Sequence, residues 1–149
     1  MDIRVQEAAF DFGQEAQNFA TRQMGMGAIV TFTGIVRDVA AGLDVMEIEH
    51  YPGMTEKALT KIAEDAASRW DLGDIAIIHR HGKLYAQDMI MMVATASAHR
   101  KDAFEAAEFL MDYLKSRAPF WKKEQTREAQ DWVAAKDEDE DALTRWDED

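Results

Sequence analysis

The chain has 149 residues, no cysteine and a formal net charge of -12 at pH 7. A chain of this length forms one domain as a rule and buries roughly 70% of the surface that its unfolded form exposes, so we expect a sizeable core. The lack of cysteine excludes disulfides, thiolate metal sites and cysteine nucleophiles, and the acidic balance argues against general binding to nucleic acid or to an anionic membrane.

The first predicted elements are a short helix and a strand. Asp11, followed three residues later by Gln14, is typical of a capping box, and Gly25 provides a helix stop. The β-branched and aromatic residues of 28–36 predict a strand. Arg37 leaves the end of this strand, and we expect it on the more solvated face.

Three strands and a helix are predicted next. Met46 and Ile48 alternate with glutamates in a half-buried strand over 44–51. A helix over 54–70 follows. Its apolar stripe consists of Ala58, Leu59, Ile62, Ala63, Ala66 and Trp70. Residues 74–84 and 87–97 then predict two strands around a glycine turn at His81 and Gly82, as in an antiparallel hairpin whose second, nearly apolar strand is central.

A second long helix is predicted over 99–118, and Pro119 ends it. Its predicted buried stripe consists of Ala103, Phe104, Ala107, Leu110, Met111 and Leu114. The order strand, strand, helix, strand, strand, helix indicates an α+β fold, an antiparallel or mixed β-sheet with helices packed against it.

We expect one domain over residues 1–136 and an acidic C-terminal tail over 137–149. The run "DEDED" at 137–141 is predicted to be a solvated, mobile segment without a chemical role. The start of the chain lacks a basic segment followed by an apolar run, and no window is apolar enough for a membrane helix. The expected location is therefore cytoplasmic.

Positive charge is concentrated in "KSRAPFWKKE" at 115–124, despite the acidic total. Lys115 lies in the last turn of the long helix, and Lys122 and Lys123 follow Pro119. An amine among other cations can act as a nucleophile or general base, although lysines at a helix C-terminus can equally just complement the dipole. Phe120 and Trp121 either seal the core edge or line a groove.

His99 and Arg100 stand where the central strand passes into the long helix. The first turn of a helix attracts anions, so a phosphate site is plausible there, while the simpler alternative is a cap and a solvated arginine. His79 and His81, two apart on the predicted strand, should face the same side. With His50 or His99 they could bind zinc, but the spacing does not impose a site and we expect no metal.

These segments together resemble the large, catalytic subunit of molybdopterin synthase, between about Gly27 and Trp132. The matching segments are "GAIVTFTGIVRD" at 27–38, "EHYPGMTEKAL" at 49–59, "RW" at 69–70, "IHRHGKL" at 78–84 and "SAHRKDAFEAAEFLMDYLKSRAPFWKKE" at 97–124. The last is the most specific. One departure is "LYAQD" at 84–88, which lacks the glycine expected before the acid.

The resemblance implies a sulfurtransferase of molybdenum cofactor biosynthesis that needs no cofactor. Such enzymes convert cyclic pyranopterin monophosphate into molybdopterin by inserting two sulfurs as a dithiolene. The sulfur arrives as a thiocarboxylate on the C-terminal glycine of a small ubiquitin-like partner. The implied assembly is a heterotetramer around a homodimer of large subunits. An enzyme that takes sulfur from a partner fits a chain without cysteine.

The resemblance also implies the site. The substrate-contacting positions correspond to Ile35, Val36, Arg37, His99, Arg100, Lys115, Lys122, Lys123 and Glu124. Lys115 would be the reacting amine and Lys122 would stabilise oxyanions. Two alternatives stay open: a non-catalytic scaffold that binds the ubiquitin-like partner, and a phosphoester hydrolase that uses His79, His81 or His99 as acid and base.

Overall fold

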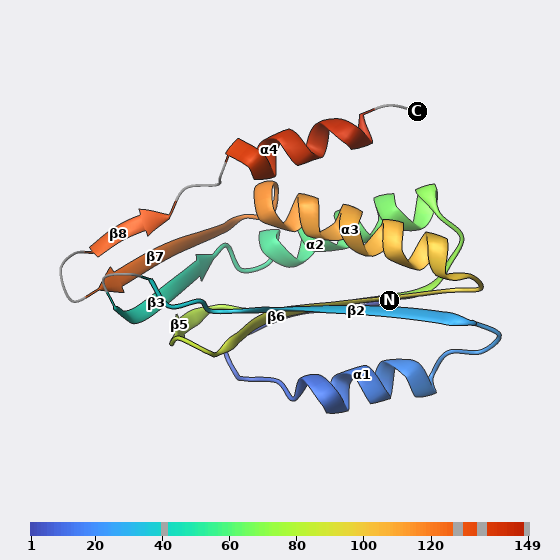
Figure 1. Ribbon diagram of the computed structural model, residues 1–149, viewed down its shortest axis with the longest axis horizontal. Helices are drawn as coiled ribbons and strands as arrows, with labels where there is room; N and C mark the ends of the chain where they lie inside the picture. The colour runs from blue at the N-terminus through green and yellow to red at the C-terminus, as the bar shows by residue number, and fades with distance from the viewer. Residues whose placement is uncertain (40–41, 127–129, 134–136, 148–149) are drawn as a thin grey trace.

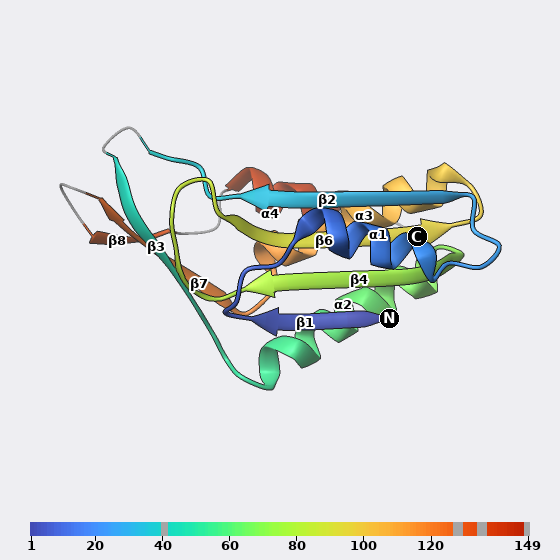
Figure 2. The same ribbon diagram turned by 90° about the horizontal axis from the view of Figure 1, so that it is seen from below.

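The computed structural model describes residues 1–39, 42–126, 130–133 and 137–147. Its larger sheet has the strand order β1-β4-β6-β2 (Figures 1 and 2). These strands span Asp2–Gln6 (β1), Ala28–Ile35 (β2), Leu72–Arg80 (β4) and Met89–Ser97 (β6). β1 was not predicted, and it runs parallel to β4, whereas the other pairs are antiparallel. The sheet is therefore mixed, as expected for the predicted α+β class.

β6 is the central strand, as predicted, because β4 and β2 flank it and helices cover both faces of the sheet. Successive residues of β4 and β6 point to opposite faces of the sheet and belong to two different hydrophobic cores. Ile77 and Val93 pack toward α2 and α3, while Ile78 and Met92 pack toward α1. A strand buried on both faces reads as a continuous apolar run, which is why "MIMMVATAS" shows no alternation.

Helices α1 (Phe12–Thr21), α2 (Met54–Arg69) and α3 (Arg100–Ser116) form the layers around this sheet. Figure 1 shows α1 below the sheet and α2 and α3 above it. The predicted cap of α1 is confirmed, since the Asp11 carboxylate accepts a hydrogen bond from the Gln14 amide at 3.1 Å. No helix among the described residues is long and apolar enough to cross a membrane.

The buried stripe of α3 differs from the prediction at one residue. Phe104 is 60% exposed, and Phe109 is buried in its place. α3 packs against α2 as well as against the sheet, so its buried face is broadened toward Ala106 and Phe109. Phe104 lies on the opposite flank of the helix, which it shares with Met111 and Lys115 at about 100° per residue.

A second, smaller sheet has the order β5-β3-β7-β8. Its strands span Leu43–His50 (β3), Gly82–Leu84 (β5), Phe120–Thr126 (β7) and Gln130–Val133 (β8). β4 and β6 pair antiparallel, as predicted, but the expected simple hairpin is wrong: after β4 the chain enters the second sheet, where Gly82 at φ 89° begins β5. His81 therefore lies between two strands and does not share a face with His79.

The acidic C-terminal segment is ordered into helix α4 (Asp137–Leu143) and a 3-10 turn, η1 (Thr144–Trp146). α4 lies on the outer side of α3 (Figure 1). Leu143 is buried and Trp146 packs against Trp70 and Phe109. The run 137–141 is mostly solvated, as predicted, and it lies within α4, which the sequence did not predict. The apolar residues that follow it, Leu143 and Trp146, anchor this helix.

Candidate functional site

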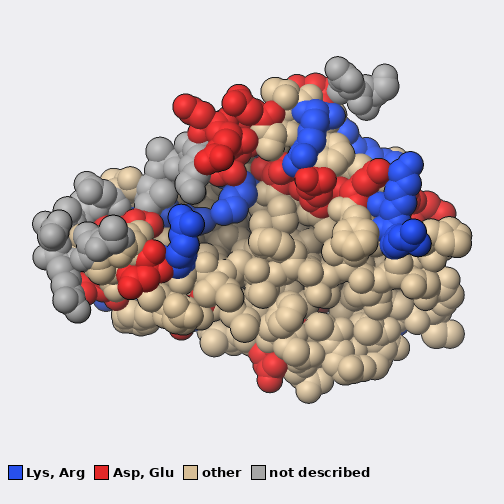
Figure 3. Space-filling view, in the orientation of Figure 1, with Lys and Arg blue, Asp and Glu red and all other residues tan. Residues whose placement is uncertain are grey.

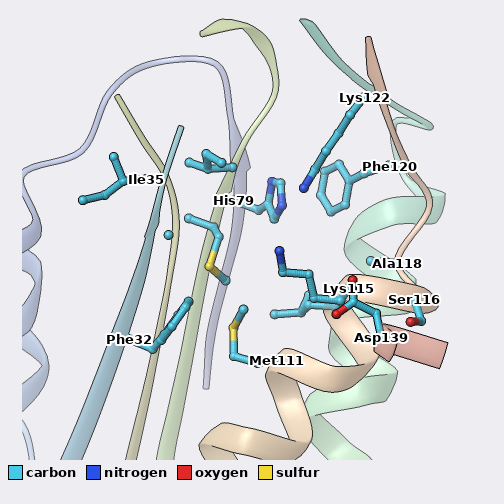
Figure 4. Close-up of a pocket in the computed structure, with 14 residues that line it drawn as sticks. Phe32, Ile35, His79, Met111, Lys115, Ser116, Ala118, Phe120, Lys122 and Asp139 are labelled. Atoms are coloured by element: carbon cyan, nitrogen blue, oxygen red, sulfur yellow. The ribbon is translucent and has the colours of Figure 1, made fainter. Parts of the chain in front are cut away.

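A pocket of about 260 Å³ lies where three elements meet: the end of β2, the C-terminal turns of α3, and the start of β7 (Figure 4). Its lining combines cations with apolar and aromatic side chains. The lining residues are Phe32, Gly34, Ile35, His79, Ile90, Met91, Met111, Leu114, Lys115, Ser116, Ala118, Phe120, Lys122 and Asp139. The two sheets and α3 therefore build one cavity from segments far apart in sequence.

Lys115 and Lys122 both reach this pocket. Lys115 projects from the flank of the last turn of α3, and Lys122 projects from the inner face of β7, where it stands opposite Ile48 of β3. In Figure 4 the amino ends of the two side chains point toward each other and toward the His79 ring. Figure 3 shows basic side chains bordering a hollow beneath the acidic side chains that gather at the start of α4. Pro119, by ending α3, lets β7 return across the helix end.

A β-bulge shapes the wall contributed by β2. The register of β2 on β6 shifts between Gly34 and Ile35, so Ile35 joins Phe32 in lining the pocket. Val36 is fully buried in a separate cluster with Met46 and Ile48. Its side chain therefore supports the pocket from behind, while its backbone bonds to residues 87 and 88.

His79 is a buried part of the wall between the two lysines. Its Nδ1 lies 2.7 Å from the carbonyl oxygen of Arg80, and its ring stacks on Phe120 at a centroid distance of 3.7 Å and an angle of 16°. Burial, together with the nearby Lys122, lowers the pKa of His79 to about 3. The imidazole is therefore neutral at physiological pH.

Arg37, Lys123 and Glu124 are not among the residues that line the pocket. Arg37 is exposed two residues beyond Ile35. Glu124 is on the same strand face as Lys122, whereas Lys123 is on the opposite face, with its Nζ 5.4 Å from the centroid of the Trp132 ring. The structure thus separates the adjacent lysines that the sequence groups together.

His99 and Arg100 lie at the other end of α3 from Lys115. His99 is the N-cap residue and Arg100 is the first residue of the helix. Fifteen residues at the α-helical rise of 1.5 Å place Arg100 about 22 Å from Lys115 along the helix axis. Within one chain, His99 and Arg100 are therefore too far from Lys115 to contact the same small molecule.

The remaining histidines form a pair of their own. The rings of His50 and His81 have centroids 4.2 Å apart, and burial lowers the pKa of His81. Of the four histidines, His79 alone lines the pocket. No three His, Asp or Glu side chains in the described part of the chain are grouped so that they could hold a metal ion.

Phe32, Met111 and Asp139 line the pocket without having been singled out by sequence reasoning. Met111 could have been found from its spacing, since it lies one helical turn before Lys115 on the same flank. Asp139 had no such signal, because its position depends on how α4 docks. Of the two aromatic residues after Pro119, Phe120 lines the pocket, and Trp121 instead contacts Tyr51 on the other face of the second sheet.

Comparisons with known proteins agree with one another. The family model described as MoaE protein matches residues 5–117. A molybdopterin synthase catalytic subunit from Cereibacter sphaeroides is 64% identical over 146 residues, which cover 98% of this chain and all of that protein. A MoaE protein structure from Burkholderia ambifaria superposes with a TM-score of 0.83 at 50% identity, covering 98% of each chain. A structure of molybdopterin synthase from Staphylococcus aureus superposes with a TM-score of 0.78 at 30% identity, covering 87% of this chain and 95% of that one.

Proposed function

Because the chain belongs to the MoaE family, we propose that it is the catalytic subunit of a molybdopterin synthase, which makes molybdopterin from cyclic pyranopterin monophosphate by inserting two sulfurs as a dithiolene. The observation that carries the proposal is the convergence of Lys115 and Lys122 in one pocket. Two cations in a partly apolar cavity suit an anionic substrate and an anionic sulfur donor.

The sulfur comes from a partner protein, because this chain has no cysteine on which to carry it. The donor is the thiocarboxylate at the C-terminal glycine of a small ubiquitin-like subunit. Its extended tail enters the pocket between the apolar wall of Phe32 and Met111 and the two ammonium groups. The reaction takes place in the cytoplasm, since a phosphorylated pterin does not cross a bilayer unaided.

Lys115 and Lys122 have different roles in this proposal. Lys115 is the reacting amine, which either shuttles protons or accepts the acyl group of the partner transiently while sulfur is delivered. Lys122 stabilises the oxyanion that develops as sulfur replaces oxygen. Arg37 and Glu124, together with the backbone at Ile35 and Val36, position the substrate.

His99 and Arg100 can serve the same substrate only if a second copy of the chain supplies them, because α3 separates them from Lys115 in one copy. We therefore include a homodimer in the proposal, at the centre of a heterotetramer with two small subunits. Apolar side chains exposed along the edge strand β2 and on α3 support this. They are Ile29, Phe32, Ile35 and Phe104.

The central test replaces the proposed reacting amine. The Lys115→Ala variant should fold normally, because this side chain is largely exposed, and should lose dithiolene formation by about 10²-fold or more. The assay mixes the purified protein with the pterin precursor and the thiocarboxylated partner. Lys61→Ala, which removes an exposed lysine from α2, is the matched control and should keep full activity. Substantial turnover by Lys115→Ala would contradict the role.

The two alternative functions make different predictions. A scaffold would bind the ubiquitin-like partner but not the phosphorylated pterin, so calorimetric titration with the pterin alone separates it from the enzyme. A histidine-based hydrolase would need several imidazoles in one cavity. His81 pairs with His50 and His99 lies at the far end of α3, and the neutral, buried His79 is a poor acid at pH 7.

A further inference from the structure

A histidine is an unexpected residue in the wall of a cationic pocket. The His79 side chain is on β4, 5% exposed, and faces the cavity rather than the apolar core below it. If the side chain at this position only filled space, Phe or Leu would do so without the cost of burying polar nitrogens. The position of each nitrogen therefore needs an explanation.

The hydrogen bond at Nδ1 determines which nitrogen carries the proton. The Arg80 carbonyl oxygen can only accept, so Nδ1 must be the donor. Since the ring is neutral, Nε2 then bears a lone pair and can only accept. The backbone of β4 thus presents a fixed hydrogen-bond acceptor to the pocket.

Two ammonium groups that can donate hydrogen bonds line the same pocket as this acceptor. Lys122, His50 and Lys115 are all close enough to His79 to lower its pKa, and of these three Lys122 does so most strongly. An ammonium group has three donors and no acceptor, so it complements an imidazole lone pair. In Figure 4 the amino ends of both lysines point toward the His79 ring, Lys122 from β7 and Lys115 from α3.

We propose that His79 is a positioning residue for the sulfur transfer proposed above: its Nε2 accepts a hydrogen bond from the Lys122 ammonium and fixes that cation across the pocket from Lys115. The inference rests on the proposed function for its catalytic consequence. A lysine side chain has four rotatable bonds, and stabilisation of a developing oxyanion depends on the donor being in place before the reaction. Stacking on Phe120 fixes the orientation of the His79 imidazole. The imidazole in turn fixes the position of the Lys122 ammonium.

Three substitutions separate this role from simple packing. His79→Phe keeps an aromatic ring on Phe120 but removes the acceptor. His79→Asn removes the ring and ends short of the lysines, while His79→Gln also removes the ring but places its amide oxygen near the former Nε2. Thermal unfolding reports on packing, and steady-state kinetics with precursor and thiocarboxylated partner report on positioning.

The positioning role predicts that His79→Phe and His79→Asn lower kcat by about tenfold or more with little change in KM. The His79→Gln variant should keep much of the kcat of the unsubstituted protein. Packing alone predicts the opposite order: Phe close to the unsubstituted protein, and Asn and Gln equally impaired. That order would overturn the inference. In a double-mutant cycle, His79→Asn should add little to the loss caused by Lys122→Ala; independent, additive losses would also overturn it.

A spectroscopic measurement keeps the inference separate from the proposed reaction. In protein labelled with ¹⁵N in its histidines, the Nε2 resonance of His79 should be that of an unprotonated nitrogen and should shift in Lys122→Ala. The Lys61→Ala variant should leave it unchanged. An unshifted Nε2 resonance contradicts the hydrogen bond whatever the enzyme does. If the unsubstituted protein makes no dithiolene, the proposed function fails, and this resonance still decides the contact.

Discussion

Lys122 and Lys123 are adjacent in the sequence, but only Lys122 lines the pocket. Successive side chains of a strand point to opposite faces, so Lys122 of β7 enters the pocket while Lys123 lies over Trp132 on the outside. Their identity and local sequence give no hint of this. Lys122 lies on the same sheet face as its β3 partner Ile48, whereas Lys123 lies on the other face with its partner Glu47.

Asp74 is a second residue whose environment fixes its chemistry. Partial burial opposes its ionisation, but hydrogen bonds from Gln23 and Arg22, both 2.9 Å long, lower the pKa of its carboxyl to about 2. The folded state therefore binds this proton less readily than the unfolded state. The resulting stabilisation is complete above the unfolded pKa near 4 and is lost as pH falls toward 2.

Replacing this carboxylate should have a pH-dependent cost. We expect Asp74→Asn to lower the free energy of unfolding by about 1 to 2 kcal/mol at pH 7, and the difference from the unsubstituted protein to shrink below about pH 4. Urea unfolding at a series of pH values measures it. Asp71→Asn, at an exposed position three residues earlier, should be nearly neutral throughout. A loss that is the same at pH 3 and pH 7 would contradict the ionic origin.

At this scale the sequence predicted residues with a local signal and missed those that depend on distant neighbours. The Asp11 cap is confirmed because its partner is three residues away. Phe104 was misplaced because periodicity alone does not reveal that α2 widens the buried face of α3. Gln87 has φ 79°, a conformation that favours glycine, at the position where the family resemblance led us to expect one.

At the scale of elements, the acidic helix α4 is the clearest example of tertiary contacts overriding composition. An acidic run has little reason to fold alone, but the segment after it carries Leu143 and Trp146. The indole nitrogen of Trp146 donates to Asp112 of α3 at 2.6 Å, and Arg117 at the end of α3 donates to Glu140 at 2.9 Å. α4 is thereby held over the C-terminal end of α3, which places Asp139 at the pocket.

The anchor of this helix can be tested directly. Trp146→Ala should destabilise the protein by about 2 to 3 kcal/mol, because it removes ring contacts with Trp70 and Phe109 together with the bond to Asp112. Trp132→Ala, which removes a tryptophan that is 56% exposed, should cost less than about 1 kcal/mol. Chemical unfolding of both variants gives the comparison. Equal losses would mean that η1 does not anchor α4.

At the scale of the whole molecule, the unpaired edge of the larger sheet carries the exposed apolar residues. β2 is the last strand of that sheet, and Phe104 on α3 lies on the helix flank that faces the same side as Met111. Exposed apolar residues grouped at a sheet edge are a common feature of interfaces between subunits. In the proposed function this edge joins two copies of the chain.

The proposed homodimer predicts a change of mass in solution. Phe104→Glu should shift the protein from dimer to monomer in light scattering coupled to gel filtration, because a charge would be buried at the interface. Unfolding measurements should show little change in the stability of each chain, since Phe104 is exposed within it. Lys101→Glu, an exposed change on the same helix, is the control. A Phe104→Glu protein that stays dimeric would place the interface elsewhere.

The α+β class and the central position of β6 were predictable because both follow from patterns within single segments. The division into two sheets was not predictable, because it depends on the chain crossing between sheets at His81 and Gly82. The pocket is formed by that division, since α3, β2 and β7 meet where the sheets diverge. Lys115 and Lys122 could be proposed from the sequence, but their convergence required the fold.

The length of α3 has a last consequence if the substrate is shared between copies. α3 holds Arg100, at its start, and Lys115, in its last turn, about 22 Å apart along the helix axis. Each catalytic centre would then need residues from two copies of the chain. Specific activity should then fall when the enzyme is diluted below the dissociation constant of the pair. Loss of the second copy would weaken substrate binding even though every side chain of the first copy stays in place.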